Sequence, residues 1–99
     1  MKVEFTDPAE ERLRKIYCRF PADIAEKMVD RILQKASTLS NLSNRGRIVE
    51  ELRSLKQGHR FIIEGNYKII YFQKNDTVYV TDVFDMSQDP GSISERNQE

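Results

Sequence analysis

The sequence has one cysteine and one histidine among its 99 residues, and these scarcities exclude several kinds of site. Cys18 has no second cysteine with which to form an intramolecular disulfide. The lone His59 provides neither a cluster with metal-ligand spacing nor a Ser-His-Asp arrangement. A phosphate-binding glycine-rich loop and a dinucleotide fingerprint are also missing. We therefore expect neither a metal nor another cofactor.

Long apolar runs are missing as well. No uninterrupted apolar segment approaches the roughly 18 residues that a membrane span requires, and the start Met1-Lys2-Val3-Glu4-Phe5 lacks the apolar core of a signal peptide. With 38% hydrophobic and 32% charged residues, the composition is that of a globular domain rather than of a disordered chain. We expect a cytoplasmic protein with no membrane partner. It should form one domain over residues 1–90, followed by a polar tail over residues 91–99.

The net charge is zero, but the charges are unevenly distributed along the chain. Residues 31–60 carry seven Lys and Arg against two Asp and Glu, whereas residues 61–99 carry three against seven. Folding can gather the basic residues of the middle third into a patch that meets phosphates or an acidic protein surface. The alternative is an ordinary solvated face. The basic residues around the predicted junction of helices and sheet are Arg45, Arg47, Arg53, Lys56 and Arg60.

The hydrophobic pattern predicts an α+β fold in which a short N-terminal strand and an α-helical hairpin pack on a small antiparallel β-sheet. Apolar residues recur at three- and four-residue spacing through two segments, Asp7–Arg19 and Ala22–Leu42. Tight turns at Gly65-Asn66 and Asn75-Asp76 separate strand-like segments. The predicted strands are Val3–Phe5, Arg60–Glu64, Tyr67–Gln73 and Thr77–Phe84.

The first predicted helix carries clear start and stop signals. Asp7 is the expected N-cap, Pro8 suits the first helical position, and Glu10 completes a pattern similar to a capping box. Pro21 ends the helix, so the two helical segments form an antiparallel hairpin with a turn at Phe20-Pro21.

Both faces of the predicted sheet are partly apolar. Strict alternation places Ile69 and Tyr71 on one face and Ile70 on the other, and it places Val80 and Phe84 together on one face. A helical hairpin covers only one face, and large exposed apolar patches usually mark binding surfaces. We therefore expect a protein partner on the second face. Cover by the C-terminal tail or by a second subunit of a homodimer is the alternative.

Three segments resemble the signatures of the RelE/ParE superfamily, the toxins of bacterial type II toxin–antitoxin modules. The resemblance spans residues 3–92 and implies the RelE/ParE-like fold. The segments are Gly46-Arg47-Ile48-Val49-Glu50-Glu51-Leu52, Gly65-Asn66-Tyr67-Lys68-Ile69-Ile70-Tyr71 and Val83-Phe84-Asp85-Met86-Ser87-Gln88-Asp89-Pro90.

The first of these segments is most similar to the ParE branch, whose members are generally regarded as poisons of DNA gyrase. The resemblance implies a growth-inhibiting toxin that binds gyrase and that a cognate antitoxin neutralises in a hetero-oligomer. Arg47 has an alternative role as an anchor for the end of the second helix, and Tyr71 an alternative role in packing the sheet. The candidate contact residues for target or partner are Arg45, Arg47, Arg60, Lys68 and Tyr71.

RelE-like members, which cut mRNA on the ribosome, provide a second interpretation. Lys68 stands where that branch commonly has Arg, and Arg60 matches a basic residue on the preceding strand, so these two are the candidate catalytic residues. Ser87 stands where many relatives have Arg, and residues 91–99 contain no Tyr, which removes the expected acid and base. A third interpretation is an inactive toxin remnant that only binds the antitoxin.

Overall fold

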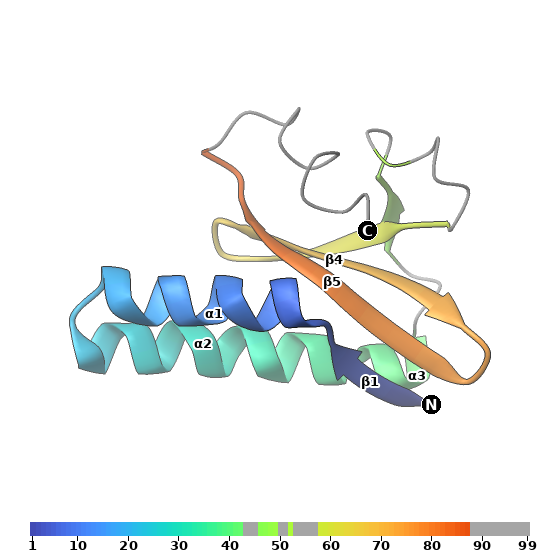
Figure 1. The fold of residues 1–99 in the computed structure, drawn as a ribbon, viewed down its shortest axis with the longest axis horizontal. Helices are drawn as coiled ribbons and strands as arrows, with labels where there is room; N and C mark the ends of the chain where they lie inside the picture. The colour runs from blue at the N-terminus through green and yellow to red at the C-terminus, as the bar shows by residue number, and fades with distance from the viewer. Residues whose placement is uncertain (43–45, 50–51, 53–57, 88–99) are drawn as a thin grey trace.

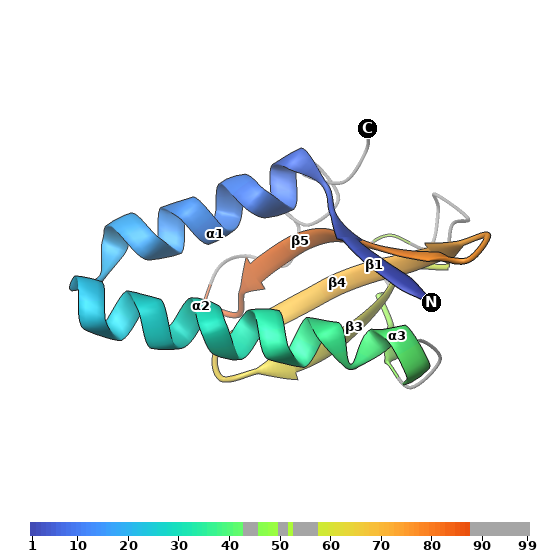
Figure 2. The same cartoon turned by 90° about the horizontal axis from the view of Figure 1, so that it is seen from below.

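The computed structural model describes residues 1–42, 46–49, 52 and 58–87, and it shows a helical layer on one face of a five-stranded mixed sheet (Figure 1; Figure 2). The predicted α+β class is confirmed. None of the helices within these ranges combines the length and apolar character needed to cross a membrane. The helices are α1 (Asp7–Arg19), α2 (Ala22–Ser37) and α3 (Leu39–Leu42). The strands, in the sheet order β1-β5-β4-β3-β2, are β1 (Lys2–Phe5), β2 (Arg47–Ile48), β3 (Arg60–Glu64), β4 (Tyr67–Lys74) and β5 (Thr77–Asp85).

The sheet is not purely antiparallel as the sequence predicted. Strand β1 pairs in parallel with β5, from Lys2 opposite Thr77 to Phe5 opposite Val80. Tight turns make the β3–β4 and β4–β5 pairs antiparallel. No turn joins β1 to β5, so turn residues in the sequence do not reveal whether these two strands run parallel or antiparallel. The result is a mixed sheet whose first strand lies beside its last (Figure 1).

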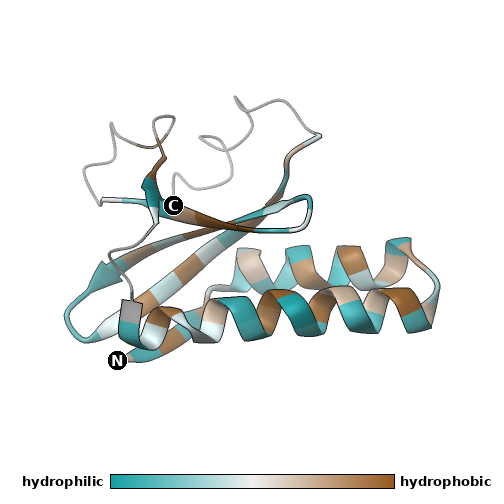
Figure 3. Cartoon of the chain, turned by 180° about the vertical axis from the view of Figure 1, so that it is seen from behind, coloured by the Kyte–Doolittle hydropathy of each residue, from teal (hydrophilic) through white to brown (hydrophobic). Residues whose placement is uncertain are grey.

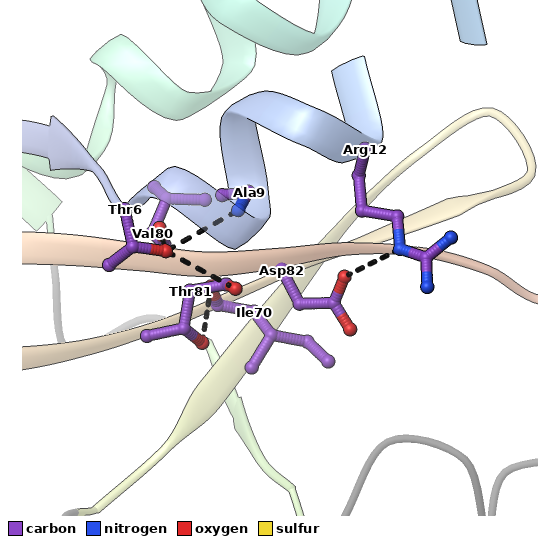
Figure 4. Close-up of polar contacts among 7 residues, drawn as sticks. All are labelled: Thr6, Ala9, Arg12, Ile70, Val80, Thr81 and Asp82. Carbon is purple, nitrogen blue, oxygen red and sulfur yellow. Dashed lines mark hydrogen bonds and ion pairs between the residues drawn. The ribbon is translucent and has the colours of Figure 1, made fainter. Parts of the chain in front are cut away.

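Helix α1 begins one residue earlier than predicted, because Thr6 rather than Asp7 is the N-cap. The Thr6 hydroxyl accepts the Ala9 N–H at 3.4 Å and donates to the Val80 carbonyl at 3.2 Å (Figure 4). Asp7 and Pro8 instead form the start of the helix, where an acidic side chain and a fixed φ are both favourable. One threonine therefore caps the helix and ties it to β5.

The second helical segment is shorter than the predicted range Ala22–Leu42. Helix α2 ends at Ser37, because the backbone N–H and the hydroxyl of Thr38 both bond to the Lys35 carbonyl, at 3.2 and 2.6 Å. The Ser37 hydroxyl bonds the Gln34 carbonyl at 2.7 Å. These side chains satisfy the terminal carbonyls of α2, and the short helix α3 follows.

The main core lies between the helices and the sheet. Figure 3 shows hydrophobic residues recurring along α1 and α2 and along the central strands. Ile16 and Ile32 of the hairpin pack against sheet residues that include Ile69, Tyr71 and Val80. All five are at most 6% exposed, so the middle of the predicted apolar stripe of each helix is buried. Tyr17, Ile24 and Leu33, which fall within the same apolar spacing, are 45%, 47% and 41% exposed, so the prediction holds only in part.

A β-bulge in β5 changes the predicted alternation. Ile70 pairs with Asp82 and Tyr71 with Val80, which leaves Thr81 as the extra residue. Val80 and Val83 therefore both face the main core, whereas Phe84 lies in a different cluster. The expected grouping of Val80 with Phe84 is wrong for this reason.

The second face of the sheet has its own small core. Val49, Leu52, Ile70 and Phe84 are each at most 3% exposed, and Phe61 packs against them. The chain itself, rather than a partner, thus covers this part of the face, which corrects the expectation of an open sheet. Among the described residues, the exposed large hydrophobic side chains belong to the N-terminal residue, to the helical hairpin and to strands β2 and β3. They are Met1, Tyr17, Ile24, Leu33, Ile48 and Ile63.

Candidate interaction site

A backbone contact at Gly46 organises the start of β2. The Gly46 N–H donates to the Tyr71 hydroxyl oxygen at 3.0 Å, and Arg60 Nη1 donates to the Gly46 carbonyl oxygen at 2.9 Å. A Cβ at Gly46 would collide with the Tyr71 hydroxyl and lie 2.8 Å from the Phe61 carbonyl oxygen. Only glycine therefore allows both partners to reach this backbone. We call Gly46, Arg60 and Tyr71 the Gly46 clamp.

Two predicted contact residues belong to this clamp. Tyr71 is 1% exposed within the main core, so its ring packs in the sheet and is not presented at the surface. Arg60 is half-buried and its guanidinium is engaged by Gly46. The structure supports the packing alternative for Tyr71, and it gives Arg60 a structural bond that the sequence did not indicate.

Arg47 and Lys68 lie on the sheet face that points away from the helices. Arg47 is exposed and directly opposite Phe61, while Lys68 is directly opposite Ile63. The Lys68 Nζ lies 4.5 Å from the centroid of the Phe61 ring, a cation–π distance. Arg47, Phe61, Ile63 and Lys68 therefore form one cationic–apolar patch, since directly opposite residues share a face.

The alternative role of Arg47 as a helix anchor has no support within the described residues. The last carbonyls of α2 are bonded by Ser37 and Thr38, and the Arg47 side chain makes no hydrogen bond or ion pair with the described residues. The fifth predicted contact residue, Arg45, lies outside the described residues, as does the polar tail 91–99.

A groove runs between α2 and the outer edge of β3, and the sequence did not predict it. Its first hollow, about 340 Å³, is lined by Met28, Arg31 and Ile32 of α2 and by Glu64 of β3, among others. Its second hollow, about 430 Å³, is lined by Lys35 of α2, by Gly46 and Arg47, and by Phe61, Ile62 and Ile63 of β3, so Arg47, Phe61 and Ile63 belong to both this hollow and the cationic–apolar patch. Figure 2 shows α2 running alongside β3. We call this the α2–β3 groove; it combines an apolar floor with the cations Arg31 and Lys35.

Asp85 lines the first hollow of the groove and accepts four hydrogen bonds. Its Oδ1 accepts the Ser87 N–H at 2.9 Å, the Ser87 hydroxyl at 2.8 Å and Asn66 Nδ2 at 2.8 Å, and its Oδ2 accepts Arg19 Nη1 at 3.3 Å. The Ser87 backbone N–H first, and then the Ser87 hydroxyl and Arg19, lower the pKa of Asp85. Ser87 thus holds the end of β5 in place.

His59 is buried against an aromatic ring rather than available to solvent. It is 3% exposed, its ring lies 5.1 Å from that of Phe72, and its Nδ1 has no hydrogen-bond partner among the residues that the structure describes. Burial lowers the pKa of His59. Within the described ranges, no group of three or more His, Cys, Asp or Glu side chains is placed to hold a metal ion.

The helical hairpin on a five-stranded mixed sheet is the architecture of the RelE/ParE-like toxins. The family model for the ParE toxin of the type II toxin–antitoxin system parDE matches residues 3–90. Because this match covers most of the sequence, the chain belongs to the ParE toxin family.

The solved structures agree with this fold. A chain from the structure described as "Chromosomal ParDE TA system from P. aeruginosa" superimposes with a TM-score of 0.69 at 19% identity, over 84% of this chain and 92% of that chain. Comparison with curated proteins gave no match.

Proposed function

We propose that this chain is a toxin that inhibits growth by binding DNA gyrase and that a cognate antitoxin neutralises by direct binding. The family match over residues 3–90 carries the proposal. A ParE-like poison needs a contact surface rather than a catalytic centre, and the cationic–apolar patch and the α2–β3 groove, which share Arg47, Phe61 and Ile63, provide adjoining surfaces of this kind.

The contacts of the basic residues favour target binding over RelE-like cleavage of mRNA. The Arg60 guanidinium bonds the Gly46 carbonyl, and the Lys68 ammonium lies over the Phe61 ring. Neither cation is arranged to clamp a phosphodiester. The Ser87 hydroxyl is likewise bonded to Asp85. Binding is therefore the chemistry that this arrangement supports best.

For the target we propose the cationic–apolar patch. Arg47 is exposed, Ile63 is 47% exposed, and Lys68 and Phe61 complete the same face. A partner that presents carboxylates around an apolar centre would match it, because complementary charge speeds encounter and selects orientation. Arginine is also enriched among the residues that dominate binding energy.

For the antitoxin we propose the α2–β3 groove. Met28 and Ile32 offer an apolar floor, and Arg31 and Lys35 stand along it on α2. An amphipathic segment with acidic residues beside its apolar anchors fits this arrangement. Arg31 is exposed and its side chain makes no ion pair with the described residues, so it is our candidate to pair with a carboxylate of the antitoxin.

The target is tested by adding the purified chain to gyrase and following the supercoiling of relaxed plasmid. We expect inhibition, and we expect Arg47→Ala to weaken it about tenfold, the effect of losing one charged contact of about 1.4 kcal/mol. Arg14→Ala is the matched control, since Arg14 is exposed on α1 far along the chain from the patch. If gyrase still supercoils the plasmid fully and transcripts are cut in a translating extract, the chain is instead an mRNA endonuclease. Activity in neither assay, with antitoxin binding retained, would establish the inactive remnant.

The antitoxin surface is tested by titrating the co-encoded protein onto the purified chain in a calorimeter. Arg31→Glu should weaken binding about tenfold or more, because it turns an attraction for acidic side chains into a repulsion. Lys74→Glu, at an exposed position near the end of β4, is the control and should leave the affinity unchanged. Equal affinity of Arg31→Glu and wild type would reject the groove as the antitoxin site.

A further inference from the structure

We infer that Tyr71 and Arg60 are positioning residues, which fix the backbone at Gly46 and so hold Arg47 in place for the target. This inference rests on the proposed function, in which Arg47 contacts the target. The sequence suggested a contact role for all three residues. Here Arg47 alone contacts the target, and Arg60 and Tyr71 hold the backbone that carries it.

The two bonds of the clamp act on successive peptide groups. Tyr71 accepts the Gly46 N–H at 3.0 Å, which belongs to the peptide group before Gly46. Arg60 donates at 2.9 Å to the Gly46 carbonyl, which belongs to the peptide group that joins Gly46 to Arg47. Together they restrain both sides of the Gly46 Cα, and the next Cα along the chain is that of Arg47. The base of the Arg47 side chain is fixed by these restraints.

Strand pairing alone gives β2 little rigidity. The strand has two residues, and its register consists of Arg47 opposite Phe61 and Ile48 opposite Arg60. Short strands fray because few bonds oppose the entropy of the chain. The clamp adds a bond to Tyr71, which is 1% exposed and immobilised in the main core. The buried Tyr71 thereby fixes the position of the start of β2.

The pleat of the sheet keeps Arg60 away from the surface that Arg47 uses. Arg47 is opposite Phe61 and Ile48 is opposite Arg60, and neighbouring residues on a strand point to opposite faces. Arg60 therefore lies on the face of Ile48 and Tyr71, whereas Arg47 lies on the face of the cationic–apolar patch. A direct contact of both arginines with one flat target surface does not fit this geometry.

A double-mutant cycle on the affinity for purified gyrase tests the inference. Tyr71→Phe removes the hydroxyl and keeps the ring; Tyr17→Phe, at the exposed Tyr17 of α1, is the matched control. We expect Tyr71→Phe to weaken binding about tenfold when Arg47 is present and less than twofold when Arg47 is Ala, since the two residues act through one contact. Arg60→Met should show the same dependence on Arg47. Equal losses in the two backgrounds would show that Tyr71 only stabilises the fold, and would overturn the inference.

Amide hydrogen exchange, followed by NMR on the free protein, gives a readout without the target. The Gly46 and Arg47 amides should exchange at least about tenfold faster in Tyr71→Phe than in wild type, and Tyr17→Phe should leave them unchanged. Unchanged exchange at both amides in Tyr71→Phe would overturn the clamp. If the wild type fails to bind gyrase, the proposed function falls, while the exchange rates still decide whether Tyr71 holds the backbone of Arg47.

Discussion

At Gly46, the missing side chain leaves room for a tyrosine hydroxyl on one side and a backbone carbonyl on the other. A Cβ there would collide with the Tyr71 hydroxyl and stand 2.8 Å from the Phe61 carbonyl oxygen. The tyrosine is part of the main core and the carbonyl is part of a paired strand, so neither yields easily. The glycine of the family motif is therefore required by packing rather than by a left-handed backbone.

Gly46→Ala should lower the free energy of unfolding by about 1–3 kcal/mol, the usual cost of overpacking a close contact. Urea unfolding of the variant and of the wild type measures this difference. The double variant Gly46→Ala/Tyr71→Phe should recover little, because the Phe61 carbonyl oxygen stays in place. An alanine variant as stable as the wild type would mean that the backbone at Gly46 can move aside at no cost.

His59 should make stability depend on pH near neutrality. Burial lowers its pKa in the folded chain below the value of 6.5 for the free side chain, so the unfolded chain binds the proton more readily. The stabilising effect of the neutral form is complete above that value and is lost as pH falls below it. We expect the unfolding temperature to drop between pH 7.5 and pH 5.5, about one unit on either side of the unperturbed pKa.

His59→Phe is the matched variant for this pH dependence, because a phenyl ring can keep the contact with Phe72 and cannot titrate. Its unfolding temperature should be nearly flat over the same range. His59 is the only histidine of the chain, so no other imidazole can replace the effect. An equally steep slope in the variant would assign the dependence to other groups.

At the scale of the element, the N-terminus of α1 depends on one hydroxyl. Thr6→Ala removes the acceptor of the Ala9 N–H and the donor to the Val80 carbonyl. We expect a loss of about 1 kcal/mol in unfolding free energy, typical of a lost N-cap. Thr6→Ser keeps the hydroxyl and should keep most of the stability. Thermal unfolding of both variants measures the effect. Equal losses in both would mean that the stability comes from the Thr6 methyl group, which neither variant has.

The elements that the sequence predicted well have a hydrophobic pattern that repeats over many residues or are bounded by a clear tight-turn signal. Strand β3 has the predicted bounds, α1 ends at the predicted Arg19, and β4 and β5 each extend one residue further. Strand β2 was missed because two residues show no periodicity. The end of α2 was misplaced because Thr38 can either continue a helix or bond the Lys35 carbonyl, and local sequence does not decide between them.

The candidate site was only partly predictable, because its contacts join residues far apart in the chain. The motif located Gly46 and Arg47, and the strand pattern located Lys68. The bond from Gly46 to Tyr71 spans 25 residues and depends on the register of three strands. The bulge at Thr81 likewise reversed a predicted face, since one extra residue shifts every later side chain.

At the scale of the whole molecule, antitoxin binding should stabilise a small domain strongly. A partner that binds only the folded chain, at a hundred times its Kd, adds about 2.7 kcal/mol. For a domain of this size, that raises the unfolding temperature by about 10–20 °C. Thermal unfolding of the chain with and without excess co-encoded antitoxin measures the shift.

Arg31→Glu should lose about half of that shift, since tenfold weaker binding removes about 1.4 kcal/mol. Lys74→Glu should show the full shift, because Lys74 does not line the α2–β3 groove. A shift that is the same in both variants would place the antitoxin elsewhere on the molecule.

The parallel pairing of β1 with β5 has a consequence for biosynthesis. Residues 2–5 pair with residues 77–80, their only strand partner in the described part of the chain, and the cap of α1 reaches across 74 positions to Val80. The ribosome therefore releases most of the polypeptide before its first strand can dock. Translation adds about 5–20 residues per second, so the nascent protein spends several seconds without its finished sheet. Under the proposed function, an antitoxin already present in the cell would meet the chain during that interval, before its fold is complete.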